Sequence, residues 1–373
     1  MKALFKPVRL GRIELKNRMI RSATWESMAD EDGHMNGAVL DHYEALAKGG
    51  ASALITGYAF VLADEQPNPR MFGAYDDTFI EDYKPLVEKV HAQDCRLFLQ
   101  LVYGGSFTWH ETDNREIWGP SAVTNKISGI TPKEMTPLDM QTLIKAFGDA
   151  ARRAEAAGFD GVQLHAGHGY LLNQFLSPFF NQREDVFGGS PEKRARVIFD
   201  IFEEIRKKTS PDFPILIKLN CSDFMGEKGF TFADCLALCK KLDAMGIAAV
   251  EVSGGPVFRA PKTEKETTYE VKEGPKESYF SPYAKKIAEE INAPVILVGG
   301  NRSTETMQSL LDETNIQCFS FSRPLLCEPD LINRWSEDKS YKPRCVSCSQ
   351  CFAPDKNSCI LNRPKSSSDA QAS

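Results

Sequence analysis

The sequence predicts one α/β domain, a (β/α)8 TIM barrel in which eight parallel strands are ringed by eight helices. Two observations support this fold. Short apolar runs alternate with longer amphipathic runs eight times along the chain, which indicates right-handed strand–helix–strand units and a parallel sheet. Polar or glycine residues also follow the strand ends, and a barrel gathers all of these ends on one face, where the active sites of this fold lie.

The strands are expected at the short apolar runs, which suit a parallel sheet buried on both faces. In chain order they are Arg18–Thr24, Ala51–Thr56, Arg96–Leu101, Gly161–His165, Pro214–Leu219, Ala248–Ser253, Pro294–Val298 and Gln317–Phe321. The helices are expected at the amphipathic runs that follow each strand. They are Leu40–Lys48, Asp77–Gln93, Leu138–Ala157, Glu192–Lys208, Phe232–Met245, Ser281–Ile291, Ser303–Glu313 and Pro329–Ser336.

Composition excludes several classes of function. The chain has 373 residues, 42% hydrophobic and 26% charged, which are ordinary values for a globular protein with a large core. A net charge of −6 without any basic cluster argues against nucleic acid as a partner. The sequence supports neither a signal peptide nor a membrane span, so neither is expected. Ten cysteines in such a chain are expected to be thiols in the cytoplasm.

The stretch from residue 165 to 189, HAGHGYLLNQFLSPFFNQREDVFGG, is the most informative in the chain. It places His165, His168 and Tyr170 directly after the fourth expected strand. Two imidazoles there could donate hydrogen bonds to a carbonyl-type oxygen, and a phenol could deliver a proton. The competing interpretations are a structural histidine pair with a core tyrosine, or two metal ligands at positions i and i+3.

Each of the last two strands of the expected barrel is followed by a turn, one with two glycines and one with an arginine. Gly299 and Gly300 follow the seventh strand, and Ser322 and Arg323 follow the eighth. Loops at these two places commonly bind phosphate in this fold, because backbone amides and a helix N-terminus favour an anion. The alternative is a pair of ordinary turns. No G-x-G-x-x-G follows a strand, so a Rossmann nucleotide site is not expected.

The run from residue 165 to 194 strongly resembles the Old Yellow Enzyme family of FMN-dependent ene-reductases, whose barrel is similar to that of 2,4-dienoyl-CoA reductase. The shared motifs are H-x-x-H-G-Y-L, FLSP, N-x-R-x-D and GGS-x-E-x-R. The resemblance implies FMN as cofactor, NAD(P)H as reductant and an activated alkene, an α,β-unsaturated carbonyl compound or a nitroalkene, as substrate. His165 and His168 would hold the substrate oxygen, and Tyr170 would protonate carbon.

The resemblance also implies the residues that contact FMN, which are Ser22, Ala23, Thr24, Trp25, Gly57, Gln100, His165, Lys218, Gly299, Gly300, Ser322 and Arg323. Two of these depart from the family pattern. Trp25 stands where many relatives have Thr or Cys, and Lys218 replaces a more usual Arg, which exchanges a bidentate fork for a point charge. The substrate range and the flavin potential are therefore expected to differ from those of many relatives.

Four cysteines lie beyond the barrel, at Cys345, Cys348, Cys351 and Cys359. Their spacing allows a [4Fe–4S] cluster, a structural zinc or a vestigial thiol-rich tail. The expected organisation is thus an FMN-binding barrel over residues 1–338, a cysteine-rich segment over 339–362 and a disordered tail over 363–373.

Two rival functions stay open at this point, and so does assembly into a homo-oligomer. In the first, an iron–sulfur flavoprotein dehydrogenase passes electrons through the tail to a protein partner. In the second, the barrel binds metal through His165 and His168 and catalyses nothing. A preparation that is yellow with bound FMN would separate the flavoprotein readings from the last one.

Overall fold

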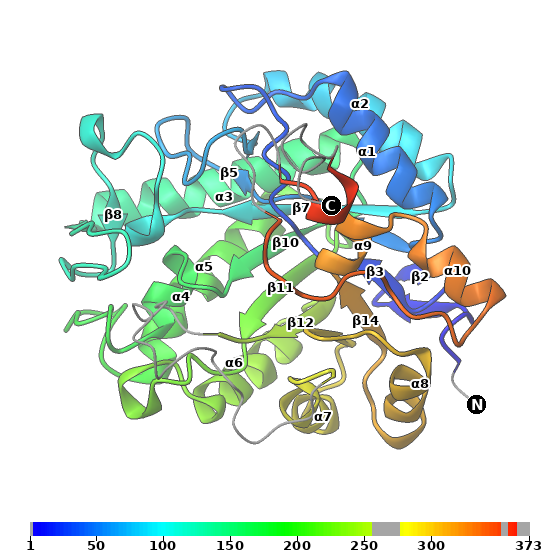
Figure 1. Ribbon diagram of the computed structural model, residues 1–373. Coiled ribbons are helices and arrows are strands. Elements are labelled where there is room, and N and C mark those ends of the chain that lie inside the picture. Colours follow the sequence, from blue (N-terminus) through cyan, green and yellow to red (C-terminus); the bar gives the residue numbers. More distant parts are fainter. Residues whose placement is uncertain (1–2, 256–276, 352–356, 364–373) are drawn as a thin grey trace, which may run out of the picture.

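A computed structural model describes residues 3–255, 277–351 and 357–363, and within them the predicted barrel is present (Figure 1). The barrel strands are β3 (Met19–Arg21), β4 (Ala53–Ile55), β7 (Arg96–Val102), β10 (Gly161–Ala166), β11 (Ile215–Asn220), β12 (Ala249–Ser253), β13 (Val295–Val298) and β14 (Cys318–Phe321). They pair in parallel in chain order, and β10 pairs with β7 within the same closed sheet. All eight strand predictions are confirmed, with ends that shift by a few residues.

The eight predicted helices are also present and surround the strands (Figure 1). They are α1 (Gly37–Lys48), α2 (Thr78–His91), α3 (Pro137–Ala157), α5 (Pro191–Lys208), α6 (Phe232–Ala244), α7 (Ser281–Glu290), α8 (Thr304–Glu313) and α10 (Leu331–Glu337). Two short helices were not predicted, α4 (Leu171–Leu176) and α9 (Arg323–Cys327). Both directly follow a strand end, where a few residues carry too little periodicity to reveal a helix.

Local sequence explains where the longest helix begins and ends. The Thr136 hydroxyl accepts from the Asp139 amide, and the Asp139 carboxylate accepts from the Thr136 amide, which forms a capping box. Pro137 occupies the first turn, where its missing N–H is not needed. The helix stops at Gly158, whose φ of 93° is a left-handed conformation that glycine adopts without strain. Helix α3 then leads directly into β10, the strand that carries His165.

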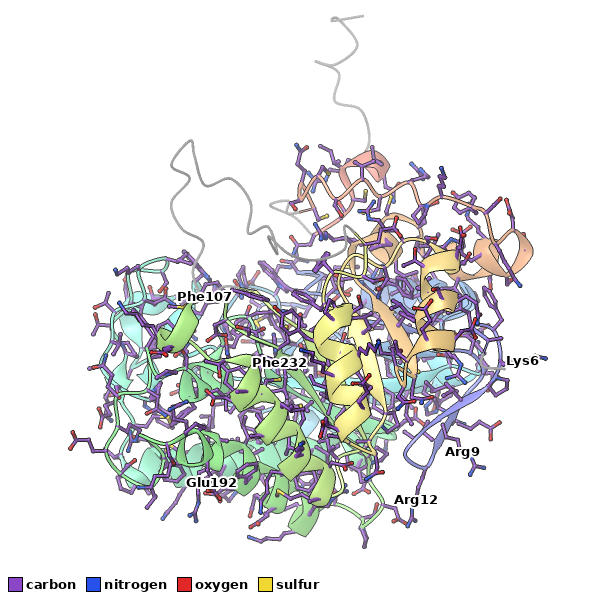
Figure 2. The ribbon with its side chains drawn as sticks, turned by 90° about the horizontal axis from the view of Figure 1, so that it is seen from below. Lys6, Arg9, Arg12, Phe107, Glu192 and Phe232 are labelled. Carbon is purple, nitrogen blue, oxygen red and sulfur yellow. The ribbon has the colours of Figure 1, made fainter. Side chains whose placement is uncertain are left out.

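An N-terminal hairpin covers the end of the barrel opposite the site. It consists of β1 (Val8–Leu10) and β2 (Ile13–Leu15), and its apolar side chains pack on a buried layer inside the barrel. That layer contains Phe98, Leu216 and Ile296 among others. Figure 2 shows Arg9 and Arg12 of the hairpin far from Phe107, which lies at the other end of the molecule. The hairpin therefore closes one end of the barrel with apolar side chains. The other end, where the strands have their carboxyl ends, is not covered by this hairpin.

Loops at the carboxyl ends of the strands contain the remaining short elements. These are β5 (Ala59–Phe60), β6 (Phe72–Gly73), β8 (Trp118–Gly119), β9 (Lys133–Glu134) and the 3-10 turns at Gly105–Phe107, Thr112–Asn114 and Gly226–Lys228. A further 3-10 turn, Ile360–Asn362, belongs to the C-terminal segment after α10. Strand β5 pairs with β6 and with the end of β7. Glu65 of the loop after β4 accepts from the Gly104 N–H of the loop after β7 at 3.0 Å, which ties these two loops together. These two loops form one wall above the barrel.

The C-terminal segment after α10 lies over the carboxyl ends of the strands, near α9 (Figure 1). Arg302 donates to the Cys345 carbonyl at 2.7 Å, and Arg323 donates to the Ser349 hydroxyl at 3.1 Å. Asn357 donates to the Trp25 carbonyl at 2.8 Å. Apart from residue 363, the predicted disordered tail lies outside the described residues. No helix in the described ranges has the length and apolar character needed to cross a membrane.

Candidate active site

A cavity of about 810 Å³ opens at the carboxyl ends of the barrel strands. A volume of this size suits a cofactor together with a small substrate. Nearly all of the predicted site residues line it: Ser22, Ala23, Thr24, Trp25, Gln100, His165, His168, Tyr170, Lys218, Gly299, Gly300, Ser322 and Arg323. The barrel thus brings together residues from six strand ends that are up to 301 positions apart in the chain.

His165 and His168 face the cavity from the end of β10 and the turn after it. Their rings lie 5.4 Å apart, centroid to centroid, at 85° to each other. His168 has a left-handed backbone, φ 58°, and its Nε2 lies 2.7 Å from the Ser253 hydroxyl. His165 is buried, and in the described part of the chain its Nδ1 has no hydrogen-bond partner. A strained backbone and an unsatisfied buried nitrogen are both typical of a ligand-binding position.

Both imidazoles are neutral at physiological pH. Burial lowers the pKa of His165 well below its ordinary value, and the nearby His168 and Lys218 lower it further. Burial also lowers the pKa of His168 to about 3, again with help from Lys218. A neutral imidazole donates one N–H without adding a full charge. The pair can therefore hold a neutral carbonyl oxygen and stabilise negative charge that develops on it.

Tyr170 follows this pair and caps the start of α4. Its ring centroid is 4.9 Å from that of His165, and its hydroxyl donates to the Tyr58 hydroxyl at 3.1 Å. Burial raises the pKa of Tyr170 to about 12. The phenol is consequently protonated at neutral pH and able to give up a proton only to a strongly basic centre, such as a carbanion-like carbon.

Below the cavity, a layer of polar side chains fills the inside of the barrel. The Lys218 ammonium donates to the Ser22 hydroxyl at 2.7 Å and to the Glu251 carboxylate at 3.4 Å. Glu251 also accepts from Gln163 at 2.9 Å, and Gln163 accepts from Gln100 at 2.7 Å. The network connects Ser22, directly after β3, with residues of β7, β10, β11 and β12. It holds the buried Lys218 ammonium in place at the cavity floor.

The loops after β13 and β14 have the geometry of an anion site. Gly299 and Gly300 adopt φ values of 108° and 77°, which exposes backbone amides without side-chain bulk. Asn301 fixes these loops by donating to the carbonyls of Leu297 at 2.8 Å and Ser320 at 3.1 Å. Arg323 lines the same part of the cavity. Amides and a guanidinium together favour a phosphate group.

Comparison with known proteins identifies the family. A family model described as the NADH:flavin oxidoreductase / NADH oxidase family matches residues 3–341. The chain belongs to this family. It is 32% identical over 327 residues to an NADPH dehydrogenase of Geobacillus sp. (strain WCH70), covering 87% of this chain and 91% of that protein.

Two further comparisons relate this member of the NADH:flavin oxidoreductase family to a longer protein and to a solved structure. A cinnamate reductase of Clostridium sporogenes is 29% identical over 391 residues, covering 97% of this chain but 57% of that protein. The chain thus spans little more than half of the length of such longer relatives. In fold, it matches the Old Yellow Enzyme homologue from Zymomonas mobilis with a TM-score of 0.77, at 24% identity over 94% of this chain and 97% of that one. The predicted Old Yellow Enzyme relationship and barrel are confirmed.

The family supports FMN as the cofactor, and this cavity fits it. Gln100 Oε1 and His165 Nδ1 are buried polar atoms that lack a partner among the described residues, as expected where a polar ring system binds. The glycine amides and Arg323 suit the phosphate end. Ser22, Ala23, Thr24 and Lys218 line the floor between these two regions. When bound, FMN would therefore be held by this set of residues.

Two predicted FMN contacts, Trp25 and Gly57, differ in their position relative to the cavity. The Trp25 indole lines the cavity and donates to the Pro69 carbonyl at 3.1 Å, so it joins the loop after β4 to the end of β3. Gly57 lies behind the cavity lining. Its N–H donates to the Tyr43 hydroxyl at 2.7 Å, and a Cβ there would come within 2.6 Å of the Glu26 carboxylate. Glycine at this position allows the strand end to pack closely on Glu26.

Sequence reasoning missed several residues of the site in this family member. Tyr58 and Asn68 come from the loop after β4, Glu251 from β12, and Phe107 and Trp109 from the loop after β7. Tyr58 lies just after a predicted strand, and Glu251 is a charged residue inside another predicted strand, so their positions could have revealed them. The others depend on how long loops fold over the barrel, which no short motif records.

The fingerprint residues beyond Tyr170 have structural roles. Asn181 donates to the carbonyls of Phe175 at 2.8 Å and Phe187 at 2.7 Å. Arg194 donates to the Leu176 carbonyl at 2.8 Å and pairs with Asp234 at 3.1 Å. These bonds hold α4 and the following loop against the barrel. These two residues of the motif therefore support the segment that follows His165, His168 and Tyr170.

The cysteine-rich segment differs in detail from its prediction. Cys345 and Cys359 are buried together with Cys327, a residue of α9 that was not among the predicted ligands, whereas Cys348 is exposed. Cys351 lines the cavity. In the described ranges, no three His, Cys, Asp or Glu side chains are arranged to hold a metal ion. Thiolate donors suit iron or zinc by type, but this arrangement is not a ready-made metal site.

Proposed function

We propose that this chain is an FMN-dependent reductase of activated C=C bonds that takes its reducing equivalents from NAD(P)H. The observation that carries the proposal is the grouping of two neutral imidazoles and one phenol on a single wall of the cavity. When bound, FMN supplies hydride to the β-carbon of the alkene. The relatives that are named NADPH dehydrogenase and cinnamate reductase support both the reductant and the substrate class.

The chain's own residues divide the remaining work. His165 and His168 would donate hydrogen bonds to the carbonyl or nitro oxygen of the substrate, which orients the alkene and stabilises charge developing on that oxygen. Tyr170 would give its hydroxyl proton to the α-carbon. Lys218 would place a positive charge at the cavity floor, where it favours an anionic reduced cofactor.

Purification followed by acid precipitation tests the cofactor. We expect a yellow protein that releases FMN, and recovery of FAD or of no flavin would refute the assignment. Rapid mixing of the reduced protein with 2-cyclohexenone then tests the reaction. Tyr170→Phe is expected to slow this step by about 10²–10⁴-fold, the usual contribution of a positioned acid, while reduction by NAD(P)H stays nearly unchanged.

A second candidate function is supported by the cysteines. Cys345 and Cys359 are buried together, and Cys351 lines the cavity. An iron–sulfur cluster or a zinc ion held by Cys345, Cys348, Cys351 and Cys359 would therefore lie near FMN. Such a protein would pass electrons to a partner. Iron and zinc analysis of protein purified without oxygen, with FMN content as the internal standard, separates the two functions. We also propose a cytoplasmic location and a chain organised as an FMN-binding barrel, a cysteine-rich segment and a tail, over residues 1–338, 339–362 and 363–373.

A further inference from the structure

Tyr58 is a second phenol in the cavity, and it lies directly beside Tyr170. The two ring centroids are 5.4 Å apart, and the two hydroxyl oxygens are 3.1 Å apart. The amide nitrogen of Asn68 completes a triangle, because it donates to the Tyr58 hydroxyl at 3.0 Å and to the Tyr170 hydroxyl at 3.4 Å. All three side chains are buried, at 9%, 6% and 7% exposure for Tyr58, Tyr170 and Asn68.

This triangle matters because proton donation by Tyr170 leaves a buried phenolate. A buried charge is tolerated only when hydrogen-bond donors satisfy it. Around the Tyr170 oxygen, the donors that the structure provides are the Tyr58 hydroxyl and the Asn68 amide. The other neighbours of this ring are the edge of Phe107, at 5.6 Å between centroids, and the tilted ring of His165, neither of which hydrogen-bonds to the oxygen among the described contacts.

The two phenols are not equivalent. Burial raises the pKa of both, and the hydrogen bonds with Tyr58 and Asn68 oppose this rise at Tyr170, whose pKa is about 12. The pKa of Tyr58 is raised well above its ordinary value, first by burial and then by the presence of Tyr170. The hydrogen bond between the two phenols therefore favours the phenolate form of Tyr170 and the protonated form of Tyr58.

We propose that Tyr58 and Asn68 are positioning residues that bind the Tyr170 phenolate after it has protonated the substrate. This inference rests on the proposed function, in which Tyr170 is the proton donor. In the resting protein, the Tyr170 hydroxyl donates to Tyr58. During the step, the Tyr170 O–H bond breaks, a C–H bond forms at the α-carbon, and the electron pair stays on the Tyr170 oxygen. The Tyr58 hydroxyl then turns to donate to that oxygen, together with the Asn68 amide.

Tyr58→Phe and Asn68→Ala test the proposal in the FMN-loaded protein. Tyr58→Phe removes only the hydroxyl and keeps the ring that packs on His165 and Tyr170. Hydrogen bonds to charged groups predict that each variant protonates 2-cyclohexenone about 10- to 100-fold more slowly. Reduction of a nitroalkene should be unchanged, because a nitronate can leave and take its proton from water. The matched control is Tyr83→Phe, which removes a buried hydroxyl bonded to the Gly73 carbonyl, outside the cavity.

The double variant Tyr58→Phe/Tyr170→Phe should react no more slowly than Tyr170→Phe alone, because Tyr58 acts through Tyr170. A second readout does not depend on turnover. With 3-fluorotyrosine placed at position 170, the fluorine NMR shift reports the pKa of this phenol directly. Tyr58→Phe and Asn68→Ala should each raise that pKa, and Tyr83→Phe should leave it unchanged.

The possible outcomes separate this inference from the proposed function. If Tyr170→Phe slows enone reduction but Tyr58→Phe does not, the phenolate-binding role is wrong and the donor stands. Equal slowing of enone and nitroalkene by Tyr58→Phe would make Tyr58 a packing residue, which also overturns the inference. If Tyr170→Phe leaves enone reduction intact, the donor itself is wrong, and the inference is lost with it.

Discussion

The Lys218 ammonium lies 3.4 Å from the Glu251 carboxylate inside the barrel, and both side chains are buried. Burial alone would raise the pKa of Glu251, but Lys218 and the donors Ser22, Ser320 and Gln163 outweigh burial and hold that pKa below its ordinary value. Glu251 is thus ionised and balances the positive charge at the cavity floor. The register of β11 against β12 places Lys218 opposite Glu251. The sequence does not reveal this pair, because no local pattern records the register between two strands.

Glu251→Gln should destabilise the fold. Removing one partner of a buried ion pair leaves an uncompensated charge, and such changes cost about 3–5 kcal/mol. The measurement is urea unfolding followed by circular dichroism. Glu81→Gln, at a side chain that is 77% exposed, is the control and should change little. A Glu251→Gln variant as stable as the parent would show that the Lys218 charge is balanced in another way.

Glu65→Gln should change the pH dependence of stability. Burial raises the pKa of Glu65 to about 8, and its Oε2 has no partner in the described ranges, which suits a protonated carboxyl group. The folded state therefore holds this proton more tightly than the unfolded chain does. Stability should fall as pH rises from the unfolded pKa of roughly 4 towards 8, by on the order of a few kcal/mol.

The Glu65→Gln variant should show a flatter profile over that interval. An amide oxygen can still accept from the Gly104 N–H and the Thr108 hydroxyl, which lie 3.0 and 3.1 Å from Glu65 Oε1. Thermal unfolding between pH 5 and about pH 8.5 measures the difference, in a window set by the pKa values above. Parallel profiles for the variant and the parent would mean that Glu65 is ionised when folded.

His165→Ala and His168→Ala should weaken binding of oxygen ligands far more than they affect reduction of the protein by NAD(P)H. Each loses a donor to developing negative charge, worth roughly 2–4 kcal/mol in comparable sites. Titration with a phenol, followed through its charge-transfer band with the flavin, measures the affinity. His91→Ala is the control. The His91 imidazole lies outside the cavity and hydrogen-bonds to the Asp160 carboxylate, with 2.7 Å between the two atoms. Unchanged phenol affinity in both cavity variants would contradict the assignment.

Gly300→Ala should lower the FMN content of the purified protein. An added Cβ would lie 2.6 Å from the Tyr279 ring at a φ of 77°, so the loop after β13 must shift. Gly246→Ala is a matched control, because Gly246 has a φ of 84° with open space around its Cβ position. Both variants carry the same kind of backbone strain, roughly 1–2 kcal/mol, and only Gly300→Ala disturbs the anion site. Flavin absorbance per polypeptide measures the difference. Equal FMN content in the two variants would remove this loop from the site.

The sequence by itself predicted the barrel, because eight strands and eight helices each leave a local pattern of apolar residues, and because polar and glycine residues stand at the strand ends that a barrel gathers on one face. It also determined where the chemistry lies, since His165, Lys218, Gly300 and Arg323 stand at strand ends that only a barrel brings together. The fingerprint after β10 also pointed to the family, because its motif residues are consecutive in the chain and can be recognised without knowledge of the fold.

Only the tertiary structure decided which residues meet. The Lys218–Glu251 pair, the triangle of Tyr58, Asn68 and Tyr170, and the presence of Cys327 among the buried thiols all join positions that are distant in the chain. Hydrogen bonds and ion pairs act over about 3–4 Å in space, whatever the separation in sequence. Local patterns record which face a residue occupies, but the partner across the cavity is set by barrel closure and by how the long loops pack above it.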